Sequence, residues 1–262
     1  MKTFTFLLVL FFISINISSS IYSQTAGELI QEGDKYYTEF DNQKALETYQ
    51  KADKLNPGNW EVLWRISRAI VDIANKMPEA TDAQKDAKYE KYKKSFAYAD
   101  SAVKLAHDQS VTYVRRAIVN GRIALFEGVF SAIGTVNDVK DDCERAIELN
   151  NGGNYIQALS HYVLARAHAK VCEKAYLLRL PLGLGWGDMD VAIREYQTAI
   201  KLKPNYRMFY LGLAKAYIEE DEYELAKENL LMVEKAPVVL EEDDEYLKEA
   251  MSLLVEVNKE LE

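Results

Sequence analysis

The chain has 262 residues, 48% of them apolar, which suffices for the core of one large domain or two small ones. Glycine and proline are scarce, at 12 and 5 residues, and this argues against an all-β protein and for long helices. The net charge of -9 disfavours a nucleic-acid partner, because such proteins present a basic surface to the phosphates.

The N-terminal segment differs in composition from the rest of the chain. Lys2 precedes an apolar run over 4–17, and three serines follow at 18–20. This is the layout of a secretory signal peptide, and the run is shorter than the roughly 20 residues of a membrane-spanning helix. We expect a signal peptide over 1–23 and a mature chain over 24–262 that is periplasmic or secreted and has no stable membrane insertion. An uncleaved segment kept as an anchor is the alternative. No cysteine follows the run, so no lipid anchor is expected.

From residue 27 onward a helix-period pattern is almost continuous, and one short segment recurs within it. The segments 51–57, 101–107, 145–151 and 198–204 each have alanine in second place and leucine in fifth. A helix stop follows each leucine, and in two segments it is a proline, which cannot continue a helix. These segments are typical of the second helix of a tetratricopeptide repeat (TPR), where a small residue lets two helices approach closely.

The remaining TPR positions fit around these anchors. Val233 lies 34 residues after Ala199, which is the TPR period, whereas the earlier spacings are longer and indicate insertions near 77–86, 127–135 and 178–188. We predict an all-α, TPR-like solenoid of about five antiparallel helix pairs over 24–262. A closing helix over about 244–260 should cover the apolar end of the stack, with Asp243 or Asp244 as its N-cap.

Four segments of the chain resemble those of a known protein family. Segments 62–69, 181–189, 192–196 and 203–206 resemble the bacterial branch of the regulator of microtubule dynamics family, over roughly 26–255. The resemblance implies a TPR protein. Animal members associate with microtubules, and bacterial members have no assigned activity. The signal peptide departs from a microtubule role. A looser similarity is to the periplasmic TPR lipoproteins that accompany TRAP-type transporters, whose lipid-bearing cysteine this chain lacks.

The two cysteines, Cys143 and Cys172, lie on either side of a predicted turn near Gly153. In an antiparallel helix pair they would be roughly 13 Å apart along the axis, at about 1.5 Å per residue. A disulfide requires Cα atoms within about 7 Å. We therefore predict two free, buried thiols.

The sequence offers no catalytic or metal constellation. His161, His168 and Cys172 share one helix stripe, where packing in the helical core is a simpler interpretation than a zinc site without a fourth ligand. The glycine-rich segment 183–187 lacks the Lys-Ser/Thr pair of a phosphate loop. We predict a protein without catalytic residues, metal or cofactor.

The most informative pattern is a positive stripe on the predicted concave face, which the first helices of TPR pairs line. Position nine of the repeat is occupied by Asp34, Arg68, Ile118, Arg166 and Lys215. Position five, one turn earlier, is occupied by Ile30, Trp64, Val114, Tyr162 and Leu211. Arginine can bind a carboxylate bidentately, with aromatic contacts alongside. The predicted ligand-binding residues are Trp64, Arg68, Tyr162, Arg166 and Lys215. In the alternative interpretation, these cations pair with acidic neighbours.

These features predict a non-catalytic extracytoplasmic scaffold that binds a protein or peptide partner in its concave groove, for example within an envelope complex. The alternative is a periplasmic binding protein for an acidic or amphipathic small molecule, associated with a transporter. A cavity of a few hundred Å³ between the inserted loops would favour the second.

Overall fold

The computed structural model describes residues 24–127 and 132–262, so the predicted signal peptide over 1–23 lies outside the described residues. Within those ranges the chain is helical and contains no strand. The helices are α1 (Ala26–Thr38), α2 (Asn42–Leu55), α3 (Trp60–Asn75), α4 (Asp82–Leu105), α5 (Ser110–Ala124), α6 (Ala132–Leu149), α7 (Gly153–Cys172), α8 (Tyr176–Arg179), the 3-10 helix η1 (Leu180–Leu182), α9 (Met189–Leu202), α10 (Arg207–Glu219), α11 (Tyr223–Lys235) and α12 (Asp243–Glu260).

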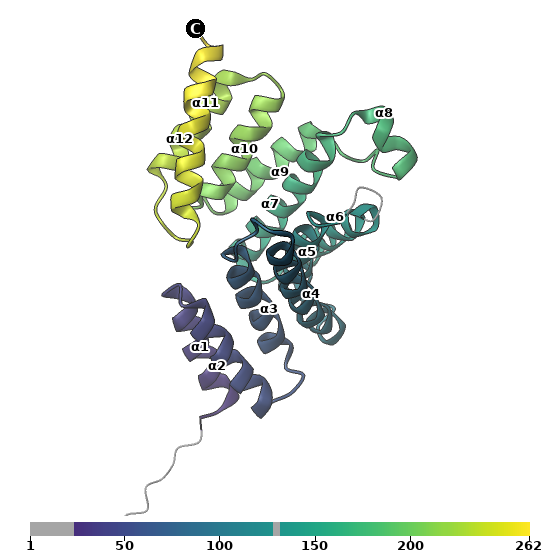
Figure 1. Ribbon diagram of the computed structural model, residues 1–262, viewed down its shortest axis with the longest axis vertical. Coiled ribbons are helices and arrows are strands. Elements are labelled where there is room, and N and C mark those ends of the chain that lie inside the picture. Colours follow the sequence, from purple (N-terminus) through teal and green to yellow (C-terminus); the bar gives the residue numbers. More distant parts are fainter. Residues whose placement is uncertain (1–23, 128–131) are drawn as a thin grey trace, which may run out of the picture.

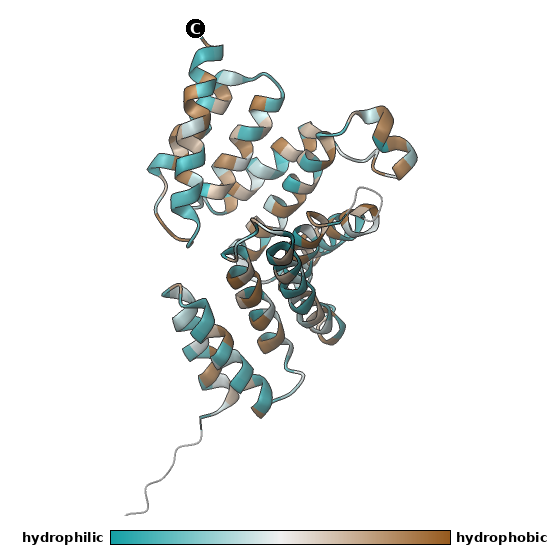
Figure 2. Ribbon diagram, viewed as in Figure 1, coloured by the Kyte–Doolittle hydropathy of each residue, from teal (hydrophilic) through white to brown (hydrophobic). Residues whose placement is uncertain are grey.

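The helices pack as five pairs and a closing helix (Figure 1). The pairs are α1 with α2, α3 with α4, α5 with α6, α7 with α9, and α10 with α11, and α12 packs on the last pair. The predicted fold class is therefore confirmed. Apolar residues concentrate where the helices face one another, and polar residues cover much of the outer surface (Figure 2).

The recurring anchors occupy equivalent, fully buried places. Ala52, Ala102, Ala146 and Ala199 each have 0% of their surface exposed. Close approach is also visible at the first-helix glycines. A Cβ on Gly33 would lie 2.4 Å from the ring of Tyr49, and one on Gly212 would lie 2.5 Å from the ring of Tyr196. Each tyrosine stands three residues before an anchor alanine, so one packing rule serves both ends of the stack.

The insertions lengthen helices as well as loops. Thr81 and Gln84 form a capping box that starts α4 within the first predicted insertion, and α4 runs for 24 residues. The second insertion is partly absorbed by α6, which already includes Thr135. The third carries α8 and η1 before the chain reaches Asp188, whose side chain caps α9.

The start of α12 differs from the prediction. Its N-cap is Glu242, without a side-chain capping bond, and Asp243 is the first helical residue. The buried Asp243 carboxylate instead accepts hydrogen bonds from the backbone N–H groups of Val239 (2.6 Å) and Leu240 (2.7 Å). Asp243 thus closes the turn that precedes the helix. The sequence could not distinguish these roles, because both use a carboxylate beside exposed backbone donors.

The stack is curved, with the first helices on its inner side. Helix α3 contacts α5, α5 contacts α7 and α7 contacts α10, whereas consecutive second helices do not pack to the same extent in the described residues. The curvature brings the start of α12 back to the N-terminal pairs, where Asn42 donates to Glu241 (2.9 Å) and Lys76 to Glu245 (3.1 Å). The start of α12 and the turn before it therefore lie opposite the beginning of α2 and the end of α3, which their side chains contact (Figure 1).

Candidate binding groove

We call the inner face formed by α1, α3, α5, α7 and α10 the groove. Trp64 and Arg68 lie on α3, Tyr162 and Arg166 on α7, and Lys215 on α10, as the repeat positions predicted. The surroundings of these five residues nevertheless differ, and the difference decides which of them can reach a ligand.

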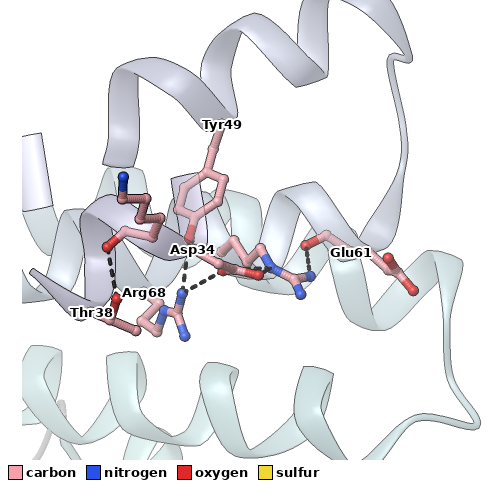
Figure 3. A network of polar contacts seen from close by, with 7 residues as sticks. Asp34, Thr38, Tyr49, Glu61 and Arg68 are labelled. Atoms are coloured by element: carbon pink, nitrogen blue, oxygen red, sulfur yellow. Dashed lines mark hydrogen bonds and ion pairs between the residues drawn. The ribbon is translucent and has the colours of Figure 1, made fainter. Parts of the chain in front are cut away.

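Arg68 is part of a polar network at the N-terminal end of the groove (Figure 3). It donates to the Asp34 carboxylate (3.2 Å) and to the Tyr49 hydroxyl (3.0 Å). Arg65 Nε donates to both Asp34 oxygens, at 3.0 and 3.1 Å. Only 10% of the Arg68 side chain is exposed. Arg68 therefore already has the carboxylate partner that a ligand was expected to supply.

Aromatic rings complete this site. The Arg68 guanidinium lies 3.4 Å from the centroid of Tyr37 and 5.0 Å from that of Trp64. Burial opposes ionisation of Asp34, but hydrogen bonds from Arg65 and Tyr49 outweigh it and hold the pKa of the carboxyl below its ordinary value. Between α3 and α5 only a hollow of ≈ 20 Å³ remains beside Arg68. This end of the groove is a packed structural cluster.

Arg166 lies in different surroundings. Its side chain is exposed, and within the described residues it forms no ion pair with a carboxylate. Its guanidinium is 5.7 Å from the centroid of Tyr162, and this phenol raises the pKa of Arg166 although desolvation by the surrounding groove opposes it. Tyr162 itself is fixed by ring contacts with Tyr196 (5.9 Å) and Phe209 (5.1 Å). The result is a solvent-accessible cation on a rigid aromatic base.

Lys215 is intermediate between these cases, because it pairs with Glu249 of α12 and both side chains remain about half exposed. An exposed pair of this kind exchanges partners at low cost. Of the three predicted cations, Arg166 is thus directly available to an anionic ligand. Lys215 becomes available when it exchanges Glu249 for the ligand, and Arg68 is already paired with Asp34.

The repeat positions chosen from the sequence missed several groove residues. Tyr37, Asp72 and Arg122 stand three or four residues after position nine, on the same helix faces, so extending the inner-face stripe by one helical turn identifies them. Burial, followed by the charge of Glu242, raises the pKa of Asp72 to about 6. Burial thus brings the titration of Asp72 closer to neutral pH than that of an ordinary aspartate.

Tyr246 carried no sequence signal, because it reaches the groove only through the curvature of the stack. Burial and then Tyr162 raise the pKa of this phenol, with further effects of Glu242, Arg122 and Arg166. A residue of α12 therefore faces α5 and α7 across the groove.

A pocket of ≈ 590 Å³ lies where α12 meets the N-terminal pairs. It is lined by Asn75, Glu79, Lys85, Lys88 and Tyr92 from α3, α4 and their connection, by Arg122, Leu125 and Phe126 near the end of α5, and by Glu242, Glu245 and Tyr246 at the start of α12. Its volume falls in the range of about 300–1,000 Å³ typical of small-molecule sites. The aromatic side is ordered, since the Tyr92 and Phe126 rings are 5.8 Å apart.

The cysteine and histidine stripe has local structural partners. Both cysteines are free, as predicted, and Cys143 is buried, but Cys172 is only half-buried and lies 3.7 Å from Arg179. His161 contacts Glu195 at 2.5 Å, and the His168 ring packs edge-on against Trp186 at 5.0 Å. Within the described ranges no three potential ligands gather into a metal site, and no helix there is both long and apolar enough to cross a bilayer.

Solved structures with this architecture include TPR proteins. A thermophilic TPR protein of Thermus thermophilus superposes with a TM-score of 0.65 at 16% identity, covering 88% of this chain and 100% of that one. Yeast Tom70 superposes with a TM-score of 0.53 at 13% identity, covering 90% of this chain and 40% of that one. The fold is that of a TPR solenoid, in which stacked helix pairs form a curved array.

Curated relatives agree with the family resemblance. Regulator of microtubule dynamics protein 1 of Mus musculus is 25% identical over 229 residues, covering 87% of this chain and 73% of the relative. The Bos taurus protein is 26% identical over 240 residues, covering 87% and 70%. The sequence profile of the family described as regulator of microtubule dynamics protein 1-3 matches residues 29–258. The chain therefore belongs to this family.

Proposed function

We propose that this chain is a non-catalytic extracytoplasmic scaffold that binds a protein or peptide partner in its groove. The observation that carries the proposal is Arg166, an exposed arginine without a carboxylate partner in the described residues, held against Tyr162 on the inner face of a TPR stack. A guanidinium in this position can bind a carboxylate through two parallel hydrogen bonds. The ligand group that fits is a peptide carboxylate, from a C-terminus or an acidic side chain.

Neighbouring groups supply the rest of the recognition. Tyr246 offers aromatic surface near Arg166, the buried Tyr162 supports the guanidinium from below, and the pair of Lys215 with Glu249 can open to give a second cation. Because Tyr162 is buried among other rings, the aromatic wall is fixed before binding, and little side-chain entropy is lost.

The extracytoplasmic location rests on the apolar run and serines of 1–23, which have the form of a signal peptide. The family relatives are named for regulating microtubules, which are cytoplasmic, so we propose a different partner here. Cosedimentation of the purified chain with assembled microtubules, lost on Arg166→Gln, would overturn this choice.

An array of synthetic peptides with free C-terminal carboxylates tests the proposal. The peptides contain no acidic side chains. Amidation of the C-terminus of a peptide that binds should weaken its affinity for the chain at least tenfold. The Arg166→Gln variant should bind the unmodified peptide more weakly by the same factor. Arg194→Gln, an exposed arginine of α9 in the outer layer, is the matched control and should bind normally. Binding that is indifferent to both amidation and Arg166→Gln would contradict the proposal.

A second candidate function is supported by the ≈ 590 Å³ pocket, which suits an amphipathic small molecule. It combines cations such as Arg122 with the rings of Tyr92 and Phe126. Native mass spectrometry of the purified chain distinguishes the two functions. A retained small molecule that is lost on Arg122→Gln, but kept on Arg166→Gln, would favour the pocket over the groove.

A further inference from the structure

Four large apolar side chains project from α8 and η1, at the outer edge of the fold. Tyr176, Leu177, Leu178 and Leu180 are 53%, 79%, 65% and 47% exposed, and we call them the apolar tip. Elsewhere in the described residues, exposed large apolar side chains occur singly or in twos, as at Val238 with Val239 and at Met251 with Val255, which lie one turn apart on α12. Figure 2 shows the apolar colouring of this segment, and Figure 1 shows it standing away from the stacked pairs.

The base of the apolar tip is firmly built. Arg179 is buried and donates to the Gly187 carbonyl oxygen at 2.8 Å, and the Leu184 N–H donates to the Arg179 carbonyl oxygen at 3.1 Å. The indole of Trp186 donates to Asn137 at 2.8 Å. A Cβ on Gly187 would lie 2.4 Å from Val171, so only glycine lets the segment return this close to α7. The leucines are thus held outward by a fixed backbone.

The segment that carries the apolar tip contains no acidic residue. No carboxylate occurs between residues 174 and 187, although the chain contains 41 acidic residues. The exposed Lys174 stands at the start of the segment, beside Glu173, whose carboxylate is paired with Lys170. A surface with an apolar tip, a basic residue at its edge and no acidic side chain of its own complements the negative potential of an anionic bilayer.

Size and shape also favour a bilayer over a protein. A stable protein interface uses roughly 20–30 residues on each side, whereas the apolar tip offers four side chains on a projecting turn. A bilayer needs no matching hollow, and a tyrosine beside leucines is the composition found at the boundary between head groups and acyl chains.

We propose that the apolar tip docks this protein peripherally on an anionic lipid bilayer. Leu177, Leu178 and Leu180 enter the acyl boundary, Tyr176 lies at the head-group level, and Lys174 contacts the lipid phosphates. None of the four tip residues lines the pocket, so docking leaves the pocket accessible. The protein lies on the membrane and does not cross it.

Vesicle cosedimentation tests this directly, with the full chain and vesicles of phosphatidylcholine containing about a third phosphatidylglycerol. The double variant Leu177→Ser/Leu178→Ser should bind at least tenfold more weakly than wild type. The control is Leu55→Ser/Leu105→Ser, two leucines on α2 and α4 that are 55% and 54% exposed, and it should bind like wild type. Any affinity due to residues 1–23 is common to all three chains.

Two further readouts make the outcome decisive. All variants should keep the wild-type circular dichroism melt, because each replaced leucine is exposed. The Lys174→Glu variant should bind the anionic vesicles several-fold more weakly and pure phosphatidylcholine vesicles unchanged. Equal binding of the tip double variant and wild type would overturn the proposal, as would a wild-type dimer in light scattering that the double variant dissociates.

Discussion

The two ends of the groove use the same arginine position in opposite ways. Arg68 on α3 is buried against Tyr37 and bound to Asp34, whereas Arg166 on α7 is exposed and lies over Tyr162 with no carboxylate among its described partners. Both occupy position nine of their repeats. The repeat pattern therefore fixes where an arginine stands, and the neighbouring repeats decide whether it stabilises the fold or is available to a ligand.

The largest expected effect is on the stability of the N-terminal end of the groove, where Arg68 is paired with Asp34. Asp34→Ala removes the carboxylate shared by Arg65 and Arg68 and leaves Arg68 buried without its counter-charge. We expect the free energy of unfolding to fall by about 2–3 kcal/mol, less than for a fully buried pair because Asp34 is partly exposed. Urea denaturation measures it. A loss no larger than that of an exposed substitution such as Asp86→Ala would contradict the pairing of Arg68 with Asp34.

The next effect concerns pH. Burial raises the pKa of Asp72 to about 6 in the folded chain, above the ordinary value of about 3.9. The folded state therefore binds a proton more tightly than the unfolded chain, and Asp72 lowers stability as the pH rises from about 4 to about 6. Glu242 raises this pKa further, while Arg115, Arg68 and Tyr37 oppose the shift.

Asp72→Asn removes this titration. The difference in unfolding free energy between variant and wild type should move in favour of the variant by about 2 kcal/mol from pH 4 to pH 7. Urea denaturation at the two pH values measures it, with each chain compared at the same pH. A difference that stays constant would show that Asp72 titrates normally.

A direct contrast of the two arginines gives a smaller effect. Arg68→Met should cost about 1–2 kcal/mol, because the Asp34 and Tyr49 hydrogen bonds are lost. Arg166→Met should change stability by less than about 0.5 kcal/mol, as for other exposed positions. Thermal denaturation of both variants under one condition provides the comparison. Equal costs would mean that the two ends of the groove are not different in kind.

The smallest effect is expected where α12 meets the N-terminal pairs. Glu241→Gln with Glu245→Gln weakens the contacts to Asn42 and Lys76, which are exposed or half-buried. Exposed polar pairs contribute less than about 1 kcal/mol, so global stability should hardly change. Hydrogen exchange at the start of α12 should nevertheless become faster. Unchanged exchange would show that these contacts do not hold the two ends together.

The features that depend on local sequence pattern, namely the helix pairs and the closing helix, were predicted from the sequence. The anchors at Ala52 and Ala199 gave the helix pairs and the closing helix, because small residues at fixed spacing imply close helix crossing. The sequence also placed Arg68 and Arg166 on inner helices. It did not predict that Asp34 and Arg65 would engage Arg68, since that pairing depends on the distance between neighbouring repeats.

The contacts that arise from the curvature of the stack could not be predicted from the sequence. Tyr246 and Glu242 reach the groove and pocket because the stack bends enough to return α12 to α3, and no single repeat encodes that bend. The N-cap of α12 was misassigned for a related reason, since the Asp243 carboxylate bonds to the preceding turn and not to the helix.

The most direct test of the groove is site-specific photocrosslinking with a carboxylate peptide that the array identifies as a binder. Benzoylphenylalanine replaces either Lys170, an exposed residue one helical turn after Arg166 on α7, or Arg194 on the outer helix α9, so that Arg166 itself is kept. A crosslink between peptide and protein at position 170, and none at 194, is the predicted result. Crosslinking at 194 alone would show that the partner binds the outer surface and that the groove is not the binding site.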